Sequence, residues 1–567
     1  MPGIFVTNIV NNEKNFDLIN ISDQKTYTQE LKNKDFTIKR NSLDSFREDK
    51  VFYEDKKYII IIEGVILNSK ELIKKHRVEN LKDAIIKMIY SNDIFFNEFR
   101  GTFSGAIYYK DKKKWIVFTD HVGSHAIYYY QKNDVFIFAS QLNYIIDCMH
   151  LNGINISEDY HGIGCLLDWG YLIDNSTVVK EIKRLYPGEY LVIENNEIYV
   201  NSYYVANYKQ ESKPIEEVIE KLDVSFGKAV SRVVNKNKEN GYKTVIDISG
   251  GLDSRMIAFK ARELFDSSDF LGISFSKVGT IEQEIASNVA KKLDISFIHK
   301  ALDTDSCIRD IEDNMFMNNG SSYYTGLLCG KNISEIIDNR IFGIELTGLM
   351  GDMNESSMIS EDGLIRPSLK NQRFRTSRMF NLNEFSNYSD CMNKFETNEV
   401  FWLYTRGIMA GMNTVLSRQN YMELITPFGD VEFLEAYLSI PWAERVNKKI
   451  LLQWMKKKYP DAVKIKYSST LLPAKLTGTF RQRIITKFLK KINSVFHMDK
   501  IKMVPIDLWI KNNEKYIDEY YKNNIKSINC DINIKNKLDM LYNSNNVTDK
   551  IVSLSVIACY KLYLYTI

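Results

Sequence analysis

Cysteine, long apolar runs and a secretion signal are scarce or missing in this chain, and each absence excludes a class of protein. The 567 residues include seven cysteines, none in a CxxC pair. This spacing argues against a zinc ribbon or a disulfide framework and fits a reducing compartment. The longest aliphatic stretch, Tyr58–Ile62, is far shorter than the ~20 residues of a membrane-spanning helix. The first residues, MPGIFVTNIVNNEK, lack a basic segment followed by an apolar one. We therefore expect a cytoplasmic protein with no stable membrane insertion.

A strong charge imbalance is also missing. Lys and Arg total 75 against 72 Asp and Glu, a formal net charge of +3. A nearly balanced chain offers no bulk electrostatic attraction to nucleic acid, so no nucleic-acid partner is expected. The seven histidines show no metal-ligand spacing, and no Ser-His-Asp grouping is apparent. With 44% hydrophobic and 26% charged residues the chain is globular, and its length predicts about three or four domain-sized units.

The first part of the chain, residues 1–206, carries mostly strand patterns. Two helical patterns, at 70–76 and 81–91, interrupt short β-branched and aromatic runs at 3–9, 58–65, 105–109, 115–119, 126–131, 135–140, 190–193 and 198–200. Many strands and few helices predict a layered antiparallel sandwich. The polar stretch NYKQESKP at 207–214 has no apolar period and is typical of a linker.

From residue 215 onward, strands and helices alternate. An amphipathic helix is predicted at 215–233. Strand patterns at 243–248, 270–275 and 297–301 then alternate with helical patterns at 255–264 and 281–293. This alternation predicts a doubly wound parallel α/β sheet that binds its ligand at the carboxyl ends of the strands. After about residue 395 the pattern is largely helical.

One stretch, Lys243–Lys260 (KTVIDISGGLDSRMIAFK), carries the most specific chemistry. A β-branched strand runs into SGGLDS, and an apolar helical pattern follows. A helix N-terminus favours an anion, adjacent glycines allow close approach, and the serines add hydroxyl donors. Asp253 would repel a phosphate unless it holds a Mg²⁺ that bridges to it. No Walker G-x-x-x-x-G-K-[ST] occurs. The context favours a nucleotide-pyrophosphate site over a purely structural turn.

Further landmarks follow in a fixed order along the chain. They are FRGTF at 99–103, DHVG at 120–123, FASQ at 138–141, LYPG at 185–188, SGGLDS at 249–254, TGLMGD at 347–352, PFGD at 427–430, Lys449–Leu451 and Lys464–Lys466. In this order they resemble the class B asparagine synthetase family. The resemblance implies an N-terminal class II amidotransferase-like αββα sandwich over 1–206. It implies an ATP-pyrophosphatase synthetase domain with a helical C-terminal part over 215–567.

The resemblance also implies ATP and Mg²⁺ as cofactors. Asp253 and Asp352 correspond to the family's Mg²⁺ ligands. Both follow predicted strands, and a parallel sheet would bring the two strand ends together. The expected nucleotide-binding residues are Ile246, Ser249, Gly250, Gly251, Leu252, Asp253, Ser254, Ser274, Phe275 and Gly348.

Two lysines are candidates for stabilising charge during amide formation. Lys466 resembles the family's late lysine, and Lys449 resembles a second one. In a chain so rich in lysine either side chain could instead lie on a solvated face. Glu284 has a weaker claim to the nucleotide site, because it could equally be an exposed glutamate in the first turn of a helix.

The general base that deprotonates the attacking amine is harder to place. The family carries Tyr or Glu in the turn that reads Leu349 here, and Met350 replaces the turn's second glycine. Glu423 is our candidate base. Its alternative role is a helix-end carboxylate that pairs with Arg406 or Arg418.

The first domain departs from the family at the glutaminase site. The resemblance implies an N-terminal cysteine nucleophile, but position 2 is proline. The family's Asn-Gly at the oxyanion site reads Glu63-Gly64, and a carboxylate there would repel a developing oxyanion. We therefore expect a scaffold domain that hydrolyses no glutamine, against the alternative of a glutaminase that uses another cysteine.

Three functional hypotheses follow. Family members without the cysteine include β-lactam synthetases and lasso-peptide macrolactam synthetases, which close a ring within one substrate. The first hypothesis is an ATP-dependent macrolactam synthetase acting on a ribosomal peptide, with a leader-peptide protease as a partner. The second is an amide synthetase that joins a small carboxylate to ammonia or another amine. The third is a nucleotide-binding pseudoenzyme, against which the complete loop and both aspartates argue.

Overall fold

The first part of the molecule is a sandwich of two antiparallel six-stranded sheets. The computed structural model describes residues 2–9, 18, 24–195, 197–206, 209–303, 308–326, 328–354, 363–369, 374–381, 387–495 and 503–564. One sheet has the order β10 (Lys183–Arg184), β8 (Tyr128–Lys132), β9 (Val135–Ala139), β1 (Gly3–Thr7), β3 (Thr37–Leu43), β2 (Thr26–Lys32). The other has the order β12 (Glu197–Ser202), β11 (Glu189–Glu194), β7 (Lys114–Thr119), β6 (Gly101–Tyr109), β5 (Tyr58–Ile66), β4 (Phe52–Glu54).

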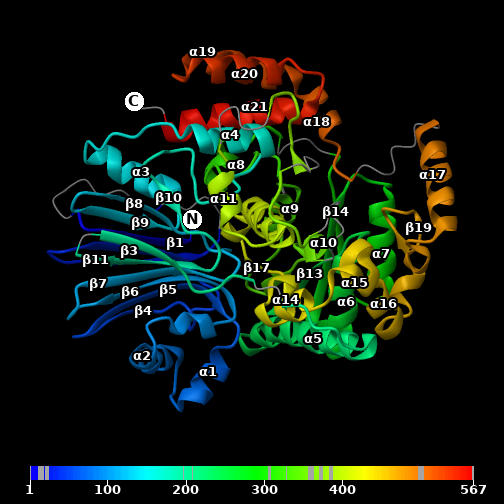
Figure 1. Cartoon of the computed structure of the whole chain (residues 1–567), viewed down its shortest axis with the longest axis horizontal. Helices are drawn as coiled ribbons and strands as arrows, with labels where there is room; N and C mark the ends of the chain where they lie inside the picture. Colours follow the sequence, from blue (N-terminus) through cyan, green and yellow to red (C-terminus); the bar gives the residue numbers. More distant parts are fainter. Residues whose placement is uncertain are drawn as a thin grey trace.

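Helices cover both outer faces of this sandwich (Figure 1). Helices α1 (Ser69–His76) and α2 (Leu81–Ser91) lie below the second sheet, and α3 (Leu142–Leu151) lies above the first. Helix α4 (Tyr160–Trp169) lies farther along, against α21 (Val547–Cys559). The layer order helix, sheet, sheet, helix confirms the predicted αββα class.

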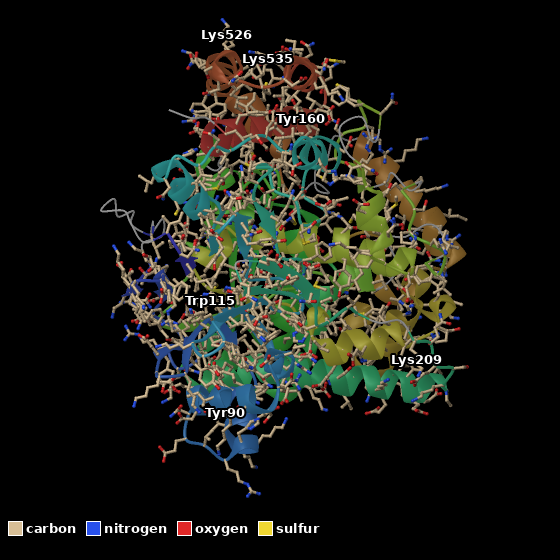
Figure 2. All side chains as sticks on the ribbon, turned by 60° about the vertical axis from the view of Figure 1, so that its left-hand side comes forward. Tyr90, Trp115, Tyr160, Lys209, Lys526 and Lys535 are labelled. Atoms are coloured by element: carbon tan, nitrogen blue, oxygen red, sulfur yellow. The ribbon has the colours of Figure 1, made fainter. Side chains whose placement is uncertain are left out.

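Strand β5 is apolar on both faces because both faces are buried. Ile60 and Ile62 pack toward α1 and α2, whereas Ile59 and Ile61 pack between the sheets with Trp115. Successive side chains of a strand point to opposite faces, so a strand buried on both sides needs an unbroken apolar run. Trp115, labelled in Figure 2, belongs to this inter-sheet core.

The second part is built on a five-stranded parallel sheet, as predicted. Its spatial order is β15 (Ser296–Ala301), β14 (Phe270–Ser276), β13 (Lys243–Asp247), β16 (Phe342–Leu346), β17 (Glu423–Ile425). The principal helices around it are α5 (Ile215–Glu239), α6 (Asp253–Leu264), α7 (Ile281–Leu293), α14 (Val431–Leu438) and α16 (Lys449–Lys458). The chain order reverses between β13 and β16, and such a switch point is where doubly wound sheets bind ligands.

The remaining elements are mostly helical. They are α8 (Ile311–Met317), α9 (Leu328–Ser334), α10 (Gly351–Asn354), α11 (Ser389–Asn393), α12 (Asn398–Trp402), the π-helical η5 (Leu403–Ala410), α13 (Gly411–Val415), α15 (Trp442–Arg445), β18 (Lys466–Tyr467), β19 (Leu472–Pro473), α17 (Phe480–Val495), α18 (Ile506–Asn512), α19 (Glu514–Ser527) and α20 (Ile532–Tyr542). Within the described ranges, none of the helices is long and apolar enough to cross a membrane.

The predicted linker falls between β12, which ends at Ser202, and α5, which begins at Ile215. Residues 207 and 208 of that stretch lie outside the described residues, so the linker and the two domain ranges stay predictions. The sequence patterns missed β2, β3, α3 and α4. Strand β3 (TIKRNSL) is almost entirely buried although it is polar, which no apolar period could reveal.

Buried polar contacts join the two parts of the molecule. On α5, Lys236 Nζ lies 2.7 Å from Asp49 Oδ1 and 2.8 Å from Ser69 Oγ. In β17, Glu423 Oε2 lies 3.2 Å from His125 Nε2. Charged groups buried in this way require partners, which fixes how the surfaces meet.

Candidate active site

The SGGLDS loop connects the end of β13 to the start of α6 and is held by its own serines. Ser249 N–H donates to Ser254 Oγ (3.0 Å), the two hydroxyls are 2.7 Å apart, and Gly251 N–H donates to Ser249 Oγ (3.1 Å). These bonds fold the loop around the N-terminus of α6, which begins at Asp253. The positive end of that helix therefore faces the space beyond the loop.

The TGLMGD turn packs directly on this loop. A Cβ placed on Gly351 would lie 2.5 Å from Asp253 Cγ, and one on Gly348 would lie 3.0 Å from Ser254 N. Only glycine allows the two turns to approach so closely. The turn follows β16 and the loop follows β13, which are parallel neighbours, so their carboxyl ends meet at one edge of the sheet.

A cleft of about 540 Å³ opens at this edge. Eight of the ten predicted nucleotide-binding residues and both predicted metal ligands line it: Ser249, Gly251, Leu252, Asp253, Ser254, Ser274, Phe275, Gly348 and Asp352. Ile246 does not line the cleft, because its side chain is fully buried in the core around β13. Gly250 does not line the cleft either, because the Glu282 carboxylate lies directly beside its Cα.

Glu282 is a cleft residue that our sequence reasoning placed two positions away, at Glu284. Glu282 Oε1 accepts the Gly250 N–H at 2.6 Å and lines the cleft. Burial raises its pKa, and the Gly250 N–H and Ser468 hydroxyl oppose that rise. Glu284 instead pairs with Lys466 at 2.9 Å, with both side chains about half exposed. Both glutamates occupy the first turn of α7, and spacing alone does not say which one faces the loop.

Arg255 is a second residue without a predicted role. Its buried guanidinium donates to the carbonyl oxygens of Ala462 (3.0 Å), Ile465 (3.2 Å) and Lys466 (2.5 Å). Burial lowers its pKa to about 10. Arg255 thereby fixes the segment after Ile465, whose Tyr467 and Ser468 line the cleft, against the SGGLDS loop.

A lysine that was not predicted, Lys448, contacts one of the predicted metal ligands. Its Nζ lies 3.0 Å from Asp352 Oδ1, and its side chain is only 11% exposed. Lys449 points elsewhere, pairing with Glu444 at 2.8 Å on the exposed surface. Lys448 has a left-handed backbone (φ 62°), and α16 starts at the next residue. Its side chain contacts the cleft residue Asp352, although Lys448 does not line the cleft itself. Lys466 is adjacent to cleft residues but does not line the cleft itself.

Glu423, the candidate base, lies in β17 away from the cleft lining. It is buried and contacts His125 (3.2 Å) and Thr102 Oγ1 (3.3 Å) of the first domain. Burial alone would raise the pKa of Glu423, but His125 outweighs burial and lowers it. Burial likewise lowers the pKa of His125, but Glu423 outweighs it and raises that pKa. The pair with His125 replaces the pairing with Arg406 or Arg418 that we considered.

The wall opposite the SGGLDS loop comes from the π-helical segment η5 and the start of α13. Gly407, Ala410 and Gly411 give it a smooth surface. Arg406 also lines the cleft, and its guanidinium lies 5.7 Å from the Tyr171 ring centre and 5.9 Å from that of Phe374. In the described part of the chain Arg406 forms no ion pair. π-helical turns are rare and frequently occur at functional sites.

A buried charge cluster supports the floor of the cleft. Arg418 pairs with Glu345 and lies 3.5 Å from Asp247 Oδ2, at the end of β13. Burial raises the pKa of Glu345 far above its usual range, although Arg418 opposes the rise. Burial would lower the pKa of Arg418, but both carboxylates raise it. The cluster ties β13, β16 and the segment before β17 together beneath the site.

The donors around Asp253 and Asp352 fit a magnesium ion. Mg²⁺ prefers hard oxygen ligands and is usually bound through one or two carboxylates plus substrate phosphates. Both carboxylates line one cleft beside an anion-favouring helix start, and Gly351 removes the side chain that would separate them.

Comparison with known proteins shows which proteins this chain is similar to. Residues 43–204 match the family of glutamine amidotransferase domains. Over 268 residues the chain is 24% identical to asparagine synthetase [glutamine-hydrolyzing] 1 of Bacillus subtilis strain 168, covering 46% of this chain and 41% of that one. Against asparagine synthetase [glutamine-hydrolyzing] 2 of the same organism the identity is 26% over 262 residues, covering 42% and 34%. The chain is similar to the asparagine synthetases.

The matches span less than half the length of these curated relatives. At this level they show a likeness to the asparagine synthetases and leave the subgroup open. Among solved structures, glutamine phosphoribosylpyrophosphate amidotransferase from B. subtilis aligns with a TM-score of 0.21 at 9% identity, covering 62% of this chain and 71% of that one.

Proposed function

We propose that this protein forms amide bonds at the expense of ATP through an acyl-adenylate, releasing AMP and pyrophosphate, and that its reaction is macrolactam closure of a ribosomal, lasso-type peptide. The observation that carries the proposal is the packing of the SGGLDS loop against the TGLMGD turn, with Asp253 and Asp352 in one cleft. An amide synthetase acting on a small carboxylate is the second candidate, and a cleft of about 540 Å³ is within the usual range for small-molecule sites.

In the first half-reaction a substrate carboxylate oxygen attacks the α-phosphorus, and pyrophosphate leaves. The start of α6 and the loop serines would hold the departing phosphates. Asp253 and Asp352 would hold Mg²⁺, which neutralises phosphate charge when bound. The rim formed by Ser274 and Phe275, at the end of β14, would take the adenosine.

In the second half-reaction an amine attacks the acyl carbon and AMP leaves. Negative charge develops on the carbonyl oxygen, and Lys448 is the cation best placed to stabilise it because it lies beside Asp352. Arg406, on the opposite wall, would orient an anionic group of the acyl substrate. Both residues make contacts that hold the reactants in place before the chemical step.

The first domain offers no obvious source of ammonia. Glu63, at the family's oxyanion position, is buried, accepts a hydrogen bond from Ser42 and lies 3.8 Å from Lys50 Nζ. The cavity lined by Thr102, His121 and Leu424 at the contact between the domains measures about 40 Å³. An amine carried by the substrate itself needs no passage through this contact, which favours ring closure.

The test is a screen for AMP and pyrophosphate release with small carboxylates and with short peptides bearing an Asp or Glu side chain. Formation of AMP rather than ADP is expected, and Asp253→Asn and Asp352→Asn should each abolish it. Product mass 18 Da below the peptide would indicate ring closure. Stimulation by small carboxylates alone would favour the second candidate, and ADP as the product would contradict both. A gene for a short precursor and a leader-peptide protease beside this one would support the first.

A further inference from the structure

Three potential metal ligands converge in the first domain, and none of them lines the cleft. His161 and Cys165 are four residues apart on α4 and therefore lie on the same face. The helix ends at Gly170, whose left-handed backbone (φ 77°) turns the chain back so that Asp174 reaches His161. His161 Nε2 lies 2.6 Å from Asp174 Oδ2 and 3.7 Å from Cys165 Sγ, and the three ligand atoms are all within 4.8 Å of one another.

We propose that His161, Cys165 and Asp174 bind one zinc ion. Imidazole, thiolate and carboxylate together suit zinc, whereas the sulfur does not suit magnesium or calcium. With zinc bonds of about 2.0–2.3 Å in a tetrahedral site, nitrogen and sulfur lie about 3.5 Å apart, close to the distance in this structure. Nitrogen and oxygen must separate to about 3.4 Å, which requires small side-chain rotations.

The surroundings hold these ligands in place. The other oxygen of Asp174, Oδ1, accepts hydrogen bonds from Ser176 N (2.9 Å) and Ser176 Oγ (2.6 Å). The ring of Tyr388 lies 5.6 Å from that of His161. Bonds of this kind orient metal-binding carboxylates and imidazoles in known sites. The Asp174 carboxylate is therefore fixed toward His161 before any ion arrives.

The three ligand groups are largely shielded from solvent. The Cys165 side chain is fully buried, with its Sγ 3.7 Å from His161 Nε2. A bound zinc ion replaces the thiol proton, so one ion neutralises both a thiolate and a carboxylate. The other charges nearby, Asp159 and Lys183, already form an ion pair at 2.9 Å.

The site has a route for entry and a fourth coordination position. His161, Asp174 and Ser176 line a cavity of about 710 Å³, from which a water molecule completes the coordination. Tyr160, the neighbour of His161, is 46% exposed. It is labelled in Figure 2. The same chain segment supports the cleft, because Tyr323 donates its N–H to Gly170 O at 2.8 Å and lines the cleft. Zinc would thus brace the part of the cleft wall that carries Tyr323.

The first experiment measures metal in the full chain without a histidine tag. We expect about one zinc per chain. After removal with a chelator, added Co²⁺ should give the near-ultraviolet charge-transfer band of a cobalt thiolate. Less than 0.1 zinc per chain together with no such band for the wild-type chain would overturn the proposal, whatever the variants do.

Variants then locate the site. Cys165→Ser should lose the cobalt band, whereas Cys148→Ser, at another buried free cysteine, should keep it. Ser176→Ala should weaken zinc binding about 10–100-fold because it frees the Asp174 carboxylate. A band retained in Cys165→Ser would contradict the assignment. If Cys165→Ser does not fold, the zinc affinity of Ser176→Ala is the deciding measurement. A Ser176→Ala chain that binds zinc as tightly as the wild type would contradict the assignment of the three ligands.

Discussion

The buried ion pair between Lys236 and Asp49 should be a principal contributor to the contact between the two domains. Their side chains are 5% and 2% exposed, and Asp49 Oδ2 also accepts the Ile66 N–H at 2.9 Å. Replacing Lys236 with Met leaves the Asp49 carboxylate buried without its cation. Breaking a buried pair in this way costs about 3–5 kcal/mol of the free energy of unfolding. Much of that cost comes from the stranded charge and not from the lost attraction.

The chain contains a matched control on the same helix. Lys238 pairs with Asp269 at 2.9 Å, but its side chain is 48% exposed. Lys238→Met should cost less than about 1 kcal/mol, because water screens an exposed pair. The double variant Lys236→Met/Asp49→Asn should recover most of the loss, since a neutral amide still accepts the Ile66 N–H.

Urea unfolding followed by tryptophan fluorescence would measure these differences, using the midpoint of the first transition if the domains unfold separately. The effect should also depend on pH. Burial raises the pKa of Asp49 even with Lys236 present. A raised carboxylate pKa means that the folded state binds a proton more tightly, so stability of Lys236→Met should rise as pH falls from 8 to 5. A loss no larger than that of Lys238→Met, or one that is independent of pH, would refute the reasoning.

Three further predictions concern the cleft and the domain contact. In an AMP-release assay, Arg406→Gln should raise the KM of the acyl substrate about 10–100-fold and leave the KM of ATP unchanged. The reason is that a charge-assisted hydrogen bond contributes roughly 1.5–3 kcal/mol. Equal effects on the two KM values would contradict a role of Arg406 in binding the acyl substrate. Lys448→Met should lower kcat about 100-fold, whereas Lys449→Met should leave it nearly unchanged, and the reverse order would restore Lys449 as the functional lysine. The His125–Glu423 pair should stabilise the fold at pH values above the lowered pKa of Glu423 and below the raised pKa of His125. The contribution of His125 should be lost as the pH rises through its raised pKa. Melting temperatures of the wild type and His125→Gln should therefore converge at high pH.

The sequence alone determined the layers and the location of the SGGLDS loop. Strand and helix periods are local properties, so β5, α2 and the alternation from β13 to β15 were visible in the printed chain. The SGGLDS loop is also local, because its glycines, serines and following helix are contiguous. Polar elements such as β3 were missed because their buried side chains are satisfied by distant partners, as Ser42 is by Glu63.

The tertiary structure decided which of several neighbouring charged residues face the cleft. Glu282 rather than Glu284 lines the cleft, and Lys448 rather than Lys449 contacts the cleft residue Asp352. It also removed Glu423 from the cleft, because β17 runs alongside the first domain and its carboxylate meets His125 there. Side-chain direction and long-range pairing depend on how elements pack, and one-dimensional spacing carries no information about either.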